Sequence, residues 1–184
     1  MKKILVIVDM QNDFLTGALG NAECAATVPE VVSLVRTGGY DTVVLTQDTH
    51  QTDYMTTREG RFLPVEHCIE GTEGWKINAE VLAAVEETYG KDSAQVQIVT
   101  KPTFGSITLG NKIAELYAGD HDLQIDYVGV CTGICVISNV MIAKAHCTEA
   151  EIRVIAKACA CVTPDSHAQA LGAMKMCQVT VVEE

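Results

Sequence analysis

Apolar residues along the chain fall into two kinds of stretch, short continuous runs and longer segments with helical spacing. The run Lys3–Asp9 is rich in β-branched residues and ends in a carboxylate. Continuous runs of this kind are typical of strands that are covered on both faces of a parallel sheet. On this pattern we predict six strands, at residues 3–9, 41–46, 95–100, 123–130, 152–161 and 178–182.

Between these runs, apolar residues recur at intervals of three and four, which is the spacing of one face of a helix. The predicted helices cover residues 29–36, 75–89, 108–117 and 132–146, and a last one begins near residue 163. Gly38-Gly39 closes the first of them. Thr163-Pro164 opens the last with an N-cap residue followed by Pro at the first helical position. Residues 14–17 are predicted as loop.

The alternation of strands and helices predicts a single α/β domain with three layers, α/β/α, around a six-stranded, mostly parallel, doubly wound sheet. A chain of 184 residues is long enough for one domain with a substantial core. We therefore expect one domain over residues 1–184, with an insertion at about 47–74. Loops as long and polar as this insertion are usually functional.

The amino-acid composition limits the kinds of partner that we expect and indicates the cellular compartment. Apolar residues make up 48% of the chain, so intrinsic disorder is not expected. The net charge of −11, without a cluster of Lys or Arg, argues against nucleic acid and anionic membranes as partners. We expect no transmembrane segment and no signal peptide. The eight cysteines form no Cys-x-x-Cys pair and several lie in apolar runs, which favours a reduced, cytoplasmic protein. A homo-oligomer is possible on the sequence.

Three potentially reactive side chains follow predicted strands. Asp9, Lys101 and Cys135 come at or just after the ends of the first, third and fourth strands. Because the carboxyl ends of parallel strands meet at one edge of a sheet, where open α/β sheets bind ligands, we expect the three to lie together. The alternative is that Cys135 is an ordinary buried cysteine, which is a common residue in protein cores.

The stretch around Cys135 predicts a strand, a tight turn and a helix start. Thr132 is expected to be the N-cap, and Gly133 to adopt the unusual backbone angles of a sharp corner. Cys135 then falls in the first helical turn. Free N–H groups and the helix dipole there favour a thiolate, so we expect its pKa to be lower than the free value of about 8.5.

Three motifs carry a family resemblance. They are Ile-Val-Asp9-Met-Gln-Asn-Asp-Phe, Val-Thr-Lys101-Pro-Thr-Phe-Gly-Ser and Gly-Val-Cys-Thr-Gly-Ile-Cys135. In this order, and over nearly the whole chain, they resemble the isochorismatase-like cysteine hydrolases, especially the nicotinamidase/pyrazinamidase-like branch. The resemblance implies an Asp9–Lys101–Cys135 catalytic triad. It also implies a cis peptide between Val130 and Cys131, and an oxyanion hole formed by the amides of Cys131 and Cys135.

The long polar segment resembles the metal site of the nicotinamidase branch. Asp48-Thr-His50 matches its Asp-x-His pair, His67 its third ligand, and Glu59 a carboxylate ligand of some members. Imidazole and carboxylate together suit Zn²⁺, Mn²⁺ or Fe²⁺. We expect one divalent metal, with Zn²⁺ as the first choice. The alternative is a solvated polar loop that binds no metal.

The resemblance implies a cysteine-dependent amidohydrolase that releases ammonia from a small amide, such as nicotinamide or pyrazinamide, through a thioester on Cys135. Phe14 and Phe104 are expected to line the substrate pocket, because they follow strands that carry the triad; the alternative is that each belongs to the core. The chain departs from the branch in having Gln51 after His50 and no aromatic residue just before His67. The aromatic residues that could supply a wall for a pyridine ring are Phe14, Phe62, Phe104 and Trp75.

Other functions remain as alternatives. A ureido or carbamoyl amidohydrolase would use the same triad, whereas isochorismate hydrolysis needs no thiol. A phosphoacceptor receiver domain resembles this chain in having an acidic residue at the end of its first strand and a Lys-Pro pair. It is shorter, however, and its Lys-Pro pair follows the fifth strand. A binding protein without catalysis is the last alternative, since fold alone does not prove function. His167 lies in a well-capped helix start and is interpreted as structural.

Overall fold

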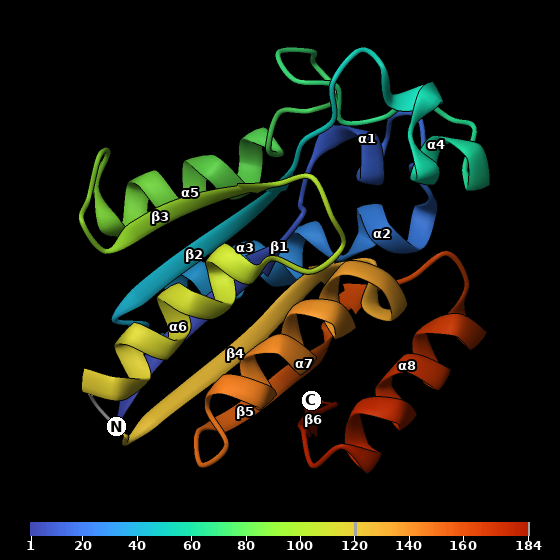
Figure 1. Cartoon of the computed structure of the whole chain (residues 1–184). Helices are drawn as coiled ribbons and strands as arrows, with labels where there is room; N and C mark the ends of the chain where they lie inside the picture. Colours follow the sequence, from blue (N-terminus) through green and yellow to red (C-terminus); the bar gives the residue numbers. More distant parts are fainter. Residues whose placement is uncertain (120, 184) are drawn as a thin grey trace.

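The sheet determines where the strand ends lie. In the computed structural model, which describes residues 1–119 and 121–183, six strands form one sheet in the order β3-β2-β1-β4-β5-β6. Every neighbouring pair is parallel (Figure 1). The strands are β1 (Lys2–Val8), β2 (Thr42–Asp48), β3 (Val96–Lys101), β4 (Leu123–Val130), β5 (Glu151–Ala160) and β6 (Thr180–Val182). This confirms the predicted doubly wound sheet, whose topological switch point lies between β1 and β4.

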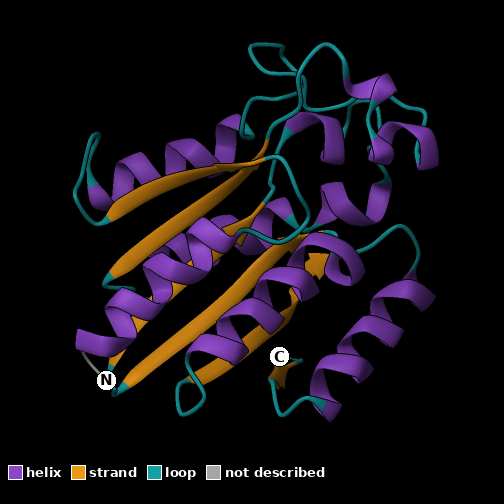
Figure 2. Ribbon diagram, in the orientation of Figure 1, coloured by secondary structure: helices purple, strands orange, loops and turns teal. Residues whose placement is uncertain are grey.

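Helices cover both faces of the sheet (Figure 2). They are α1 (Asn12–Leu15), α2 (Ala22–Ala26), α3 (Val28–Thr37), the 3-10 turn η1 (Tyr54–Thr56), α4 (Arg58–Phe62), α5 (Ala79–Tyr89), α6 (Ile107–Gly119), the π-helical turn η2 (Thr132–Val136), α7 (Ile137–His146) and α8 (Pro164–Met176). Apolar side chains of α3 and α5 belong to one core cluster, and those of α6, α7 and α8 to the other. The three-layer α/β/α prediction is therefore confirmed. Among the described residues no helix is both long and apolar enough to cross a membrane.

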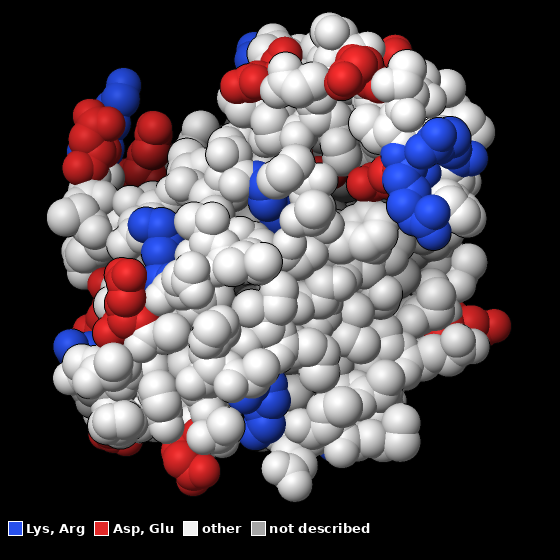
Figure 3. Space-filling model, in the orientation of Figure 1, with Lys and Arg blue, Asp and Glu red and all other residues white. Residues whose placement is uncertain are grey.

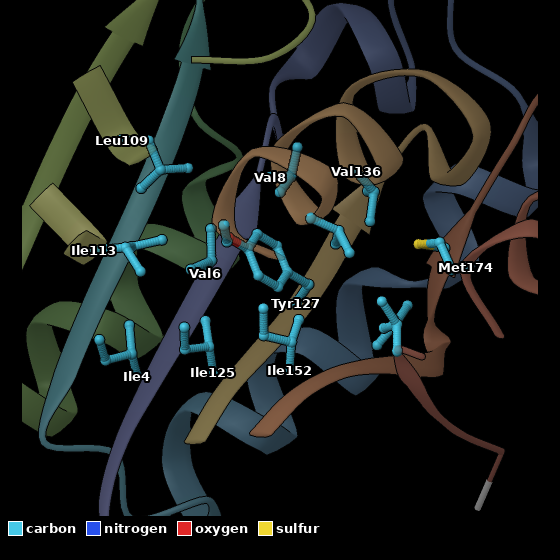
Figure 4. Close-up of a cluster of buried hydrophobic side chains, with 14 of the residues drawn as sticks. Ile4, Val6, Val8, Leu109, Ile113, Ile125, Tyr127, Val136, Ile152 and Met174 are labelled. Carbon is cyan, nitrogen blue, oxygen red and sulfur yellow. The ribbon is translucent and has the colours of Figure 1, made fainter. Parts of the chain in front are cut away.

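The continuous apolar run of β1 supplies both cores. Ile4, Val6 and Val8 point to the layer of α6, α7 and α8 (Figure 4). Leu5 and Ile7 point to the layer of α3 and α5. All five side chains are at most 2% exposed, and burial of each contributes about 1.5–3 kcal/mol to folding. After Lys2 and Lys3, β1 therefore has no polar position, and burial on both faces holds the end of the strand rigidly in place.

Some predicted boundaries are wrong. Helix α5 begins at Ala79 and not at Trp75, because the side chain of Asn78 caps it by accepting hydrogen bonds from the amides of Glu80 and Val81. The stretch predicted as loop at residues 14–17 lies partly in α1, and α2 was not predicted. Both are helices of only one turn or so, too short for a 3.6-residue period to appear in the sequence.

The turn after β4 also differs from its prediction. Thr132 is not an N-cap, because its hydroxyl lies 2.8 Å from Nδ1 of His167 in α8. The N-cap position is Cys131, whose carbonyl oxygen accepts from the amides of Ile134 and Val136 at 3.0 and 3.1 Å. The second of these bonds spans five residues and makes the turn π-helical.

The unusual backbone angles lie at Gly129 rather than at Gly133. Gly129 has φ of 110°, and the register between β4 and β5 shifts at this point. A Cβ atom on Gly129 would overlap the carbonyl oxygen of Val8, whereas one on Gly133 would find its nearest neighbour at 3.5 Å. The close approach of β4 to β1 therefore depends on glycine at position 129, immediately below the ends of both strands.

Gly129→Ala is expected to destabilise the fold by more than about 3 kcal/mol, because the new Cβ meets rigid backbone and the positive φ is strained for alanine. Urea unfolding followed by circular dichroism measures this. Gly133→Ala is the matched control and should stay within about 1 kcal/mol of wild type. Equal unfolding midpoints for the two variants would contradict this account of the β1–β4 approach.

Candidate active site

Three strand ends bring the predicted catalytic residues together. Asp9 follows β1, Lys101 ends β3, and Cys135 lies in η2 after β4. Lys101 Nζ is 2.7 Å from Asp9 Oδ2 and 3.7 Å from Cys135 Sγ. The exposed fractions of Asp9, Lys101 and Cys135 are 0%, 1% and 5%. The fold thus brings the three side chains together, although the first and the last of them are 126 positions apart in the sequence.

Thr46 of β2 fixes the orientation of Asp9. Its hydroxyl donates to Asp9 Oδ1 at 2.6 Å and accepts from the Asp9 amide at 3.1 Å. Asp9 itself has φ of 49°, a region that non-glycine residues seldom occupy. With Oδ1 held by Thr46, Oδ2 is the oxygen that meets Lys101. Sequence reasoning missed Thr46, because nothing distinguishes it from any other threonine in a strand.

The three groups titrate as a buried unit. Burial raises the pKa of Asp9, against the opposing charge of Lys101. Burial would lower the pKa of Lys101, but the negative charge of Asp9 and the influence of Cys135 outweigh it and raise that pKa. Burial, followed by the negative charge of Asp9, raises the pKa of Cys135 well above its usual range. The raised pKa favours the neutral thiol of Cys135, which lies beside the 2.7 Å ion pair of Lys101 with Asp9.

This overturns the expectation that the helix start lowers the pKa of Cys135. The thiol lies in a π-helical turn, it is almost fully buried, and it faces an anionic carboxylate. Desolvation disfavours a charged thiolate more than the turn favours it. The sequence could not reveal this, because burial depth depends on the packing around the turn.

Asn139 of α7 ties the Cys135 turn to the loop after β3. Its Nδ2 donates to the carbonyls of Cys135 at 2.8 Å and Phe104 at 3.0 Å, and its Oδ1 accepts from the amide of Ser106 at 2.8 Å. The peptide between Val130 and Cys131 is cis, as the resemblance implied. Asn139 is 1% exposed and was not singled out from sequence. It couples the two segments that carry Lys101 and Cys135.

The predicted metal ligands gather next to the triad. The ligand atoms of Asp48, His50 and His67 all lie within 4.8 Å of one another. His50 Nε2 is 3.0 Å from Asp48 Oδ2, and Glu59 Oε1 is 3.7 Å from His50 Nε2 and 3.9 Å from His67 Nε2. Ligands at about 2.05 Å from a tetrahedral Zn²⁺ are about 3.3 Å apart. The donor set and its spacing therefore fit a divalent metal.

The histidines are arranged as ligands. His67 Nδ1 lies 2.8 Å from the Val65 carbonyl, which fixes this nitrogen as the protonated one and leaves Nε2 as a lone-pair donor. His50 Nε2 is buried, and no hydrogen bond of good geometry satisfies it among the described residues. Burial lowers the pKa of His50, but the close carboxylate of Asp48, 3.0 Å from Nε2, outweighs this and raises it. Burial raises the pKa of Asp48, but His50 and Lys101 together lower it.

Asp48 connects the metal-ligand group to the triad, because its Oδ1 is 3.4 Å from Lys101 Nζ. Gln11 holds Asp48 in place. Its Nε2 donates to the carbonyls of Asp48 and Trp75 at 2.8 Å each, and its Oε1 accepts from the Asp48 amide at 2.7 Å. Gln11 thereby joins the two ends of the long inserted segment. It is fully buried, and its role was not predicted.

A cavity of about 280 Å³ opens onto both groups. Cys131 and Cys135 line it, together with Asp48, Glu59 and His67 of the metal-ligand group. Its remaining lining is mostly apolar, from Phe14, Leu19, Leu63, Phe104, Ile134 and Val162, with Asn21.

Of the four aromatic residues considered from sequence, Phe14 and Phe104 line the cavity, and the Phe14 ring centroid is 5.5 Å from that of His67. Phe62 is 77% exposed, and Trp75 donates its indole N–H to Thr49 outside the cavity. The cavity is therefore suited to a flat, apolar group.

Comparison with known proteins identifies the family of this chain. Residues 3–184 match the family model described as an isochorismatase domain. The nicotinamidase/pyrazinamidase of Bacillus subtilis is 27% identical, with a TM-score of 0.85 and full coverage of both chains. A pyrazinamidase of Pyrococcus horikoshii, solved in complex with zinc, is 24% identical, with a TM-score of 0.78 and 100% of each chain covered. The pyrazinamidase/nicotinamidase of Streptococcus mutans is 21% identical, with a TM-score of 0.83, 98% of this chain and 100% of that one covered. A search of curated protein sequences gave no significant match.

Protein purified without chelator is expected to contain about one divalent metal per chain, and His67→Ala should lose most of it, because the site then lacks one imidazole ligand. Elemental analysis measures the content. His146→Ala, which removes an exposed histidine outside the group, is the control and should keep the wild-type content. Equal metal content in both variants, or none in wild-type protein, would leave these residues without a metal role.

Proposed function

The chain belongs to the isochorismatase family, and we propose that it is a cysteine-dependent amidohydrolase that releases ammonia from a small primary amide. The observation that carries this proposal is the buried triad at the cavity. Lys101 Nζ lies within 2.7 Å of Asp9 and 3.7 Å of Cys135, and Cys135 lines the cavity. A thiol, a carboxylate and a fixed cation suit acyl transfer better than ether cleavage or phosphoryl transfer.

In the first half-reaction the sulfur of Cys135 attacks the amide carbonyl while Asp9 takes the thiol proton. Burial raises the pKa of Asp9, which makes its carboxylate a stronger base for this transfer. Burial also raises the pKa of the Cys135 thiol, and the charge of Lys101 opposes that rise. Lys101 stabilises the negative charge as it moves from carboxylate to sulfur. The proton on Asp9 then passes to the leaving nitrogen, the C–N bond breaks, and ammonia departs from a thioester on Cys135.

In the second half-reaction a water molecule attacks the thioester carbonyl. Asp9 is again the base and takes a proton from the water, and the C–S bond breaks to release the carboxylic acid. The proton returns to the sulfur of Cys135, which restores the neutral resting thiol. The net reaction consumes one amide and one water and yields one acid and one ammonia.

Both half-reactions pass through a tetrahedral oxyanion. We assign its stabilisation to the backbone amides of Cys131 and Cys135, which belong to the turn that Asn139 anchors. Preorganised donors of this kind are each worth about 3–4 kcal/mol. The hydrogen bonds from the amides of Ile134 and Val136 to the carbonyl of Cys131 support this assignment, because they define the orientation of the turn.

Asp48, His50 and His67, with Glu59, would hold one divalent metal, for which Zn²⁺ is the first choice because two imidazoles and carboxylates suit it. When bound, the ion supplies a Lewis-acidic position for a substrate donor atom. Asp48 also contacts Lys101, so the same carboxylate relates the metal site to the charge of the triad. A substrate that places a donor atom at the metal and its amide carbonyl at Cys135 must be short and flat.

Nicotinamide and pyrazinamide fit this description, because each has an aromatic ring, a ring nitrogen and a primary amide. Phe14 and Phe104 are the aromatic side chains available to contact the ring. The likeness to the Bacillus subtilis nicotinamidase/pyrazinamidase supports the same substrate class. Sister substrates with ureido or carbamoyl groups would react by the same steps and belong in the same screen.

The metal-loaded protein is expected to convert nicotinamide to nicotinate and ammonia, and Cys135→Ala should lower kcat by at least about 10³-fold, because no nucleophile remains. Ammonia release measured with a coupled assay tests this. Cys131→Ala is the matched control, since it removes the neighbouring thiol but keeps the backbone amide, and its kcat should remain within about tenfold of wild type. The reverse ranking would move the nucleophile to Cys131. Turnover of ureido or carbamoyl compounds without turnover of nicotinamide would assign the sister reaction.

Thr46→Val is expected to lower kcat about tenfold or more while leaving KM nearly unchanged, because Asp9 loses a hydrogen bond worth about 1.5–3 kcal/mol and its Oδ2 is no longer fixed. Thr46→Ser retains the hydroxyl and should recover most of the rate. Steady-state kinetics on nicotinamide separate kcat from KM. A Thr46→Val enzyme with wild-type kcat would show that Thr46 does not position the base.

A further inference from the structure

A second hollow adjoins the catalytic cavity on the outside. It has a volume of about 370 Å³ and is lined by Arg58, Glu59, Phe62 and Phe104. Glu59 and Phe104 also line the catalytic cavity, so the two spaces meet at these side chains. A molecule whose amide lies at Cys135 can therefore extend past Phe104 towards α4.

Arg58 is the cation of this outer hollow. Its guanidinium carbon lies 5.0 Å from the centre of the Phe62 ring, a cation–π contact. Figure 3 shows the basic atoms over α4 beside a hollow in the surface. Phe62 is 77% exposed, so its ring is accessible from solvent beside Arg58.

Among the described residues, Arg58 also has no carboxylate as an ion-pair partner. The chain has four arginines, and two of them, Arg36 and Arg153, form ion pairs with Glu87 and Asp126. Within the described part of the chain, neither Arg58 nor Arg61 pairs with a carboxylate, although the net charge is −11. Arg61 lies in the last turn of α4, where a cation is favourable, but Arg58 is at the first position, where it is not.

We propose that Arg58 and Phe62 form a subsite for a negatively charged group, so that this enzyme prefers primary amides that carry an anionic substituent remote from the amide. The inference rests on the proposed amidohydrolase function and narrows its substrate class. Guanidinium groups bind carboxylate and phosphate oxygens through paired hydrogen bonds. The apolar cavity holds the body of such a substrate, and the outer hollow holds its charge.

Glu59 is the acidic group that faces the same hollow. Its Oε1 is 3.7 Å from His50 Nε2 and 3.9 Å from His67 Nε2, so it is directed towards the two imidazoles. Arg58 is the basic group on the outer side of the hollow. An anionic substituent is therefore drawn to the outer end, and an amide that carries no charge gains nothing there.

The test compares matched amides with the metal-loaded enzyme. The probes are benzamides that carry a para carboxylate, attached directly or through one to three methylene groups, and the neutral methyl ester of each. We expect kcat/KM for the best carboxylate to exceed that of its ester by about three- to tenfold, the range for a partly exposed charge-assisted pair. This ratio should fall as ionic strength rises from about 0.02 M to about 0.5 M.

Arg58→Gln should reduce the ratio to about one, and Arg58→Lys should leave an intermediate value, because lysine keeps the charge but not the paired donors. Arg61→Gln is the matched control, since it removes a neighbouring cation that does not line the hollow, and it should keep the wild-type ratio. An equal fall of the carboxylate-to-ester ratio in Arg58→Gln and Arg61→Gln would show that the preference comes from the general positive potential of this surface, and it would overturn the subsite.

Two other results separate this inference from the proposed function. Nicotinamide turnover with a carboxylate-to-ester ratio of one or less across the whole series would overturn the subsite and leave the amidohydrolase intact. Absence of ammonia from every amide would overturn the amidohydrolase and the subsite together.

Discussion

The buried ion pair between Lys101 and Asp9 is the constraint on which the rest of the site depends. Removing two charges from water costs several kcal/mol per ion, and only close geometry with further hydrogen bonds offsets this. Here the pair is 2.7 Å long, Thr46 satisfies the second oxygen of Asp9, and Asp48 lies 3.4 Å from the ammonium. A small displacement of either strand end would leave a charge unsatisfied, so the sheet must hold both ends rigidly.

The sheet order explains why one member of the pair is lysine. β1 and β3 are not neighbours, because β2 lies between them. Two strand spacings of about 4.8 Å separate their ends, so the side chain from β3 must pass over the end of β2. A long, flexible alkyl chain with a compact charge meets this requirement, and on its way it contacts Asp48 at the end of β2. The same path brings the charge to the sulfur of Cys135.

Much of this arrangement could be predicted from sequence, because apolar runs report burial and parallel strands share one edge. That reasoning gave all six strands and the grouping of Asp9, Lys101 and Cys135, and motif resemblance implied the metal-ligand group. It missed Thr46, because the partner is 37 residues from Asp9 and a hydrogen bond leaves no periodic trace. It also misjudged the protonation of Cys135, since desolvation is a property of the packed core and not of the local turn. The predictions for the start of α5 and for the turn after β4 were wrong for a related reason, because side-chain and backbone hydrogen bonds determine both.

Gln11 has a consequence for how this protein could diversify. One buried side chain holds both ends of the inserted segment, at Asp48 and at Trp75, while the strands below it are packed independently. The triad is thus placed by the strand ends, whereas residues 49–74, between those two anchors, contribute Glu59, Leu63 and His67 to the cavity wall. Substitutions inside that interval, at positions other than His50, Glu59 and His67, are expected to alter the outer wall of the cavity while the strand ends that hold the triad stay in place. For protein engineering, Asp48 and Trp75 mark the junctions between which this segment can be redesigned around its metal-ligand group.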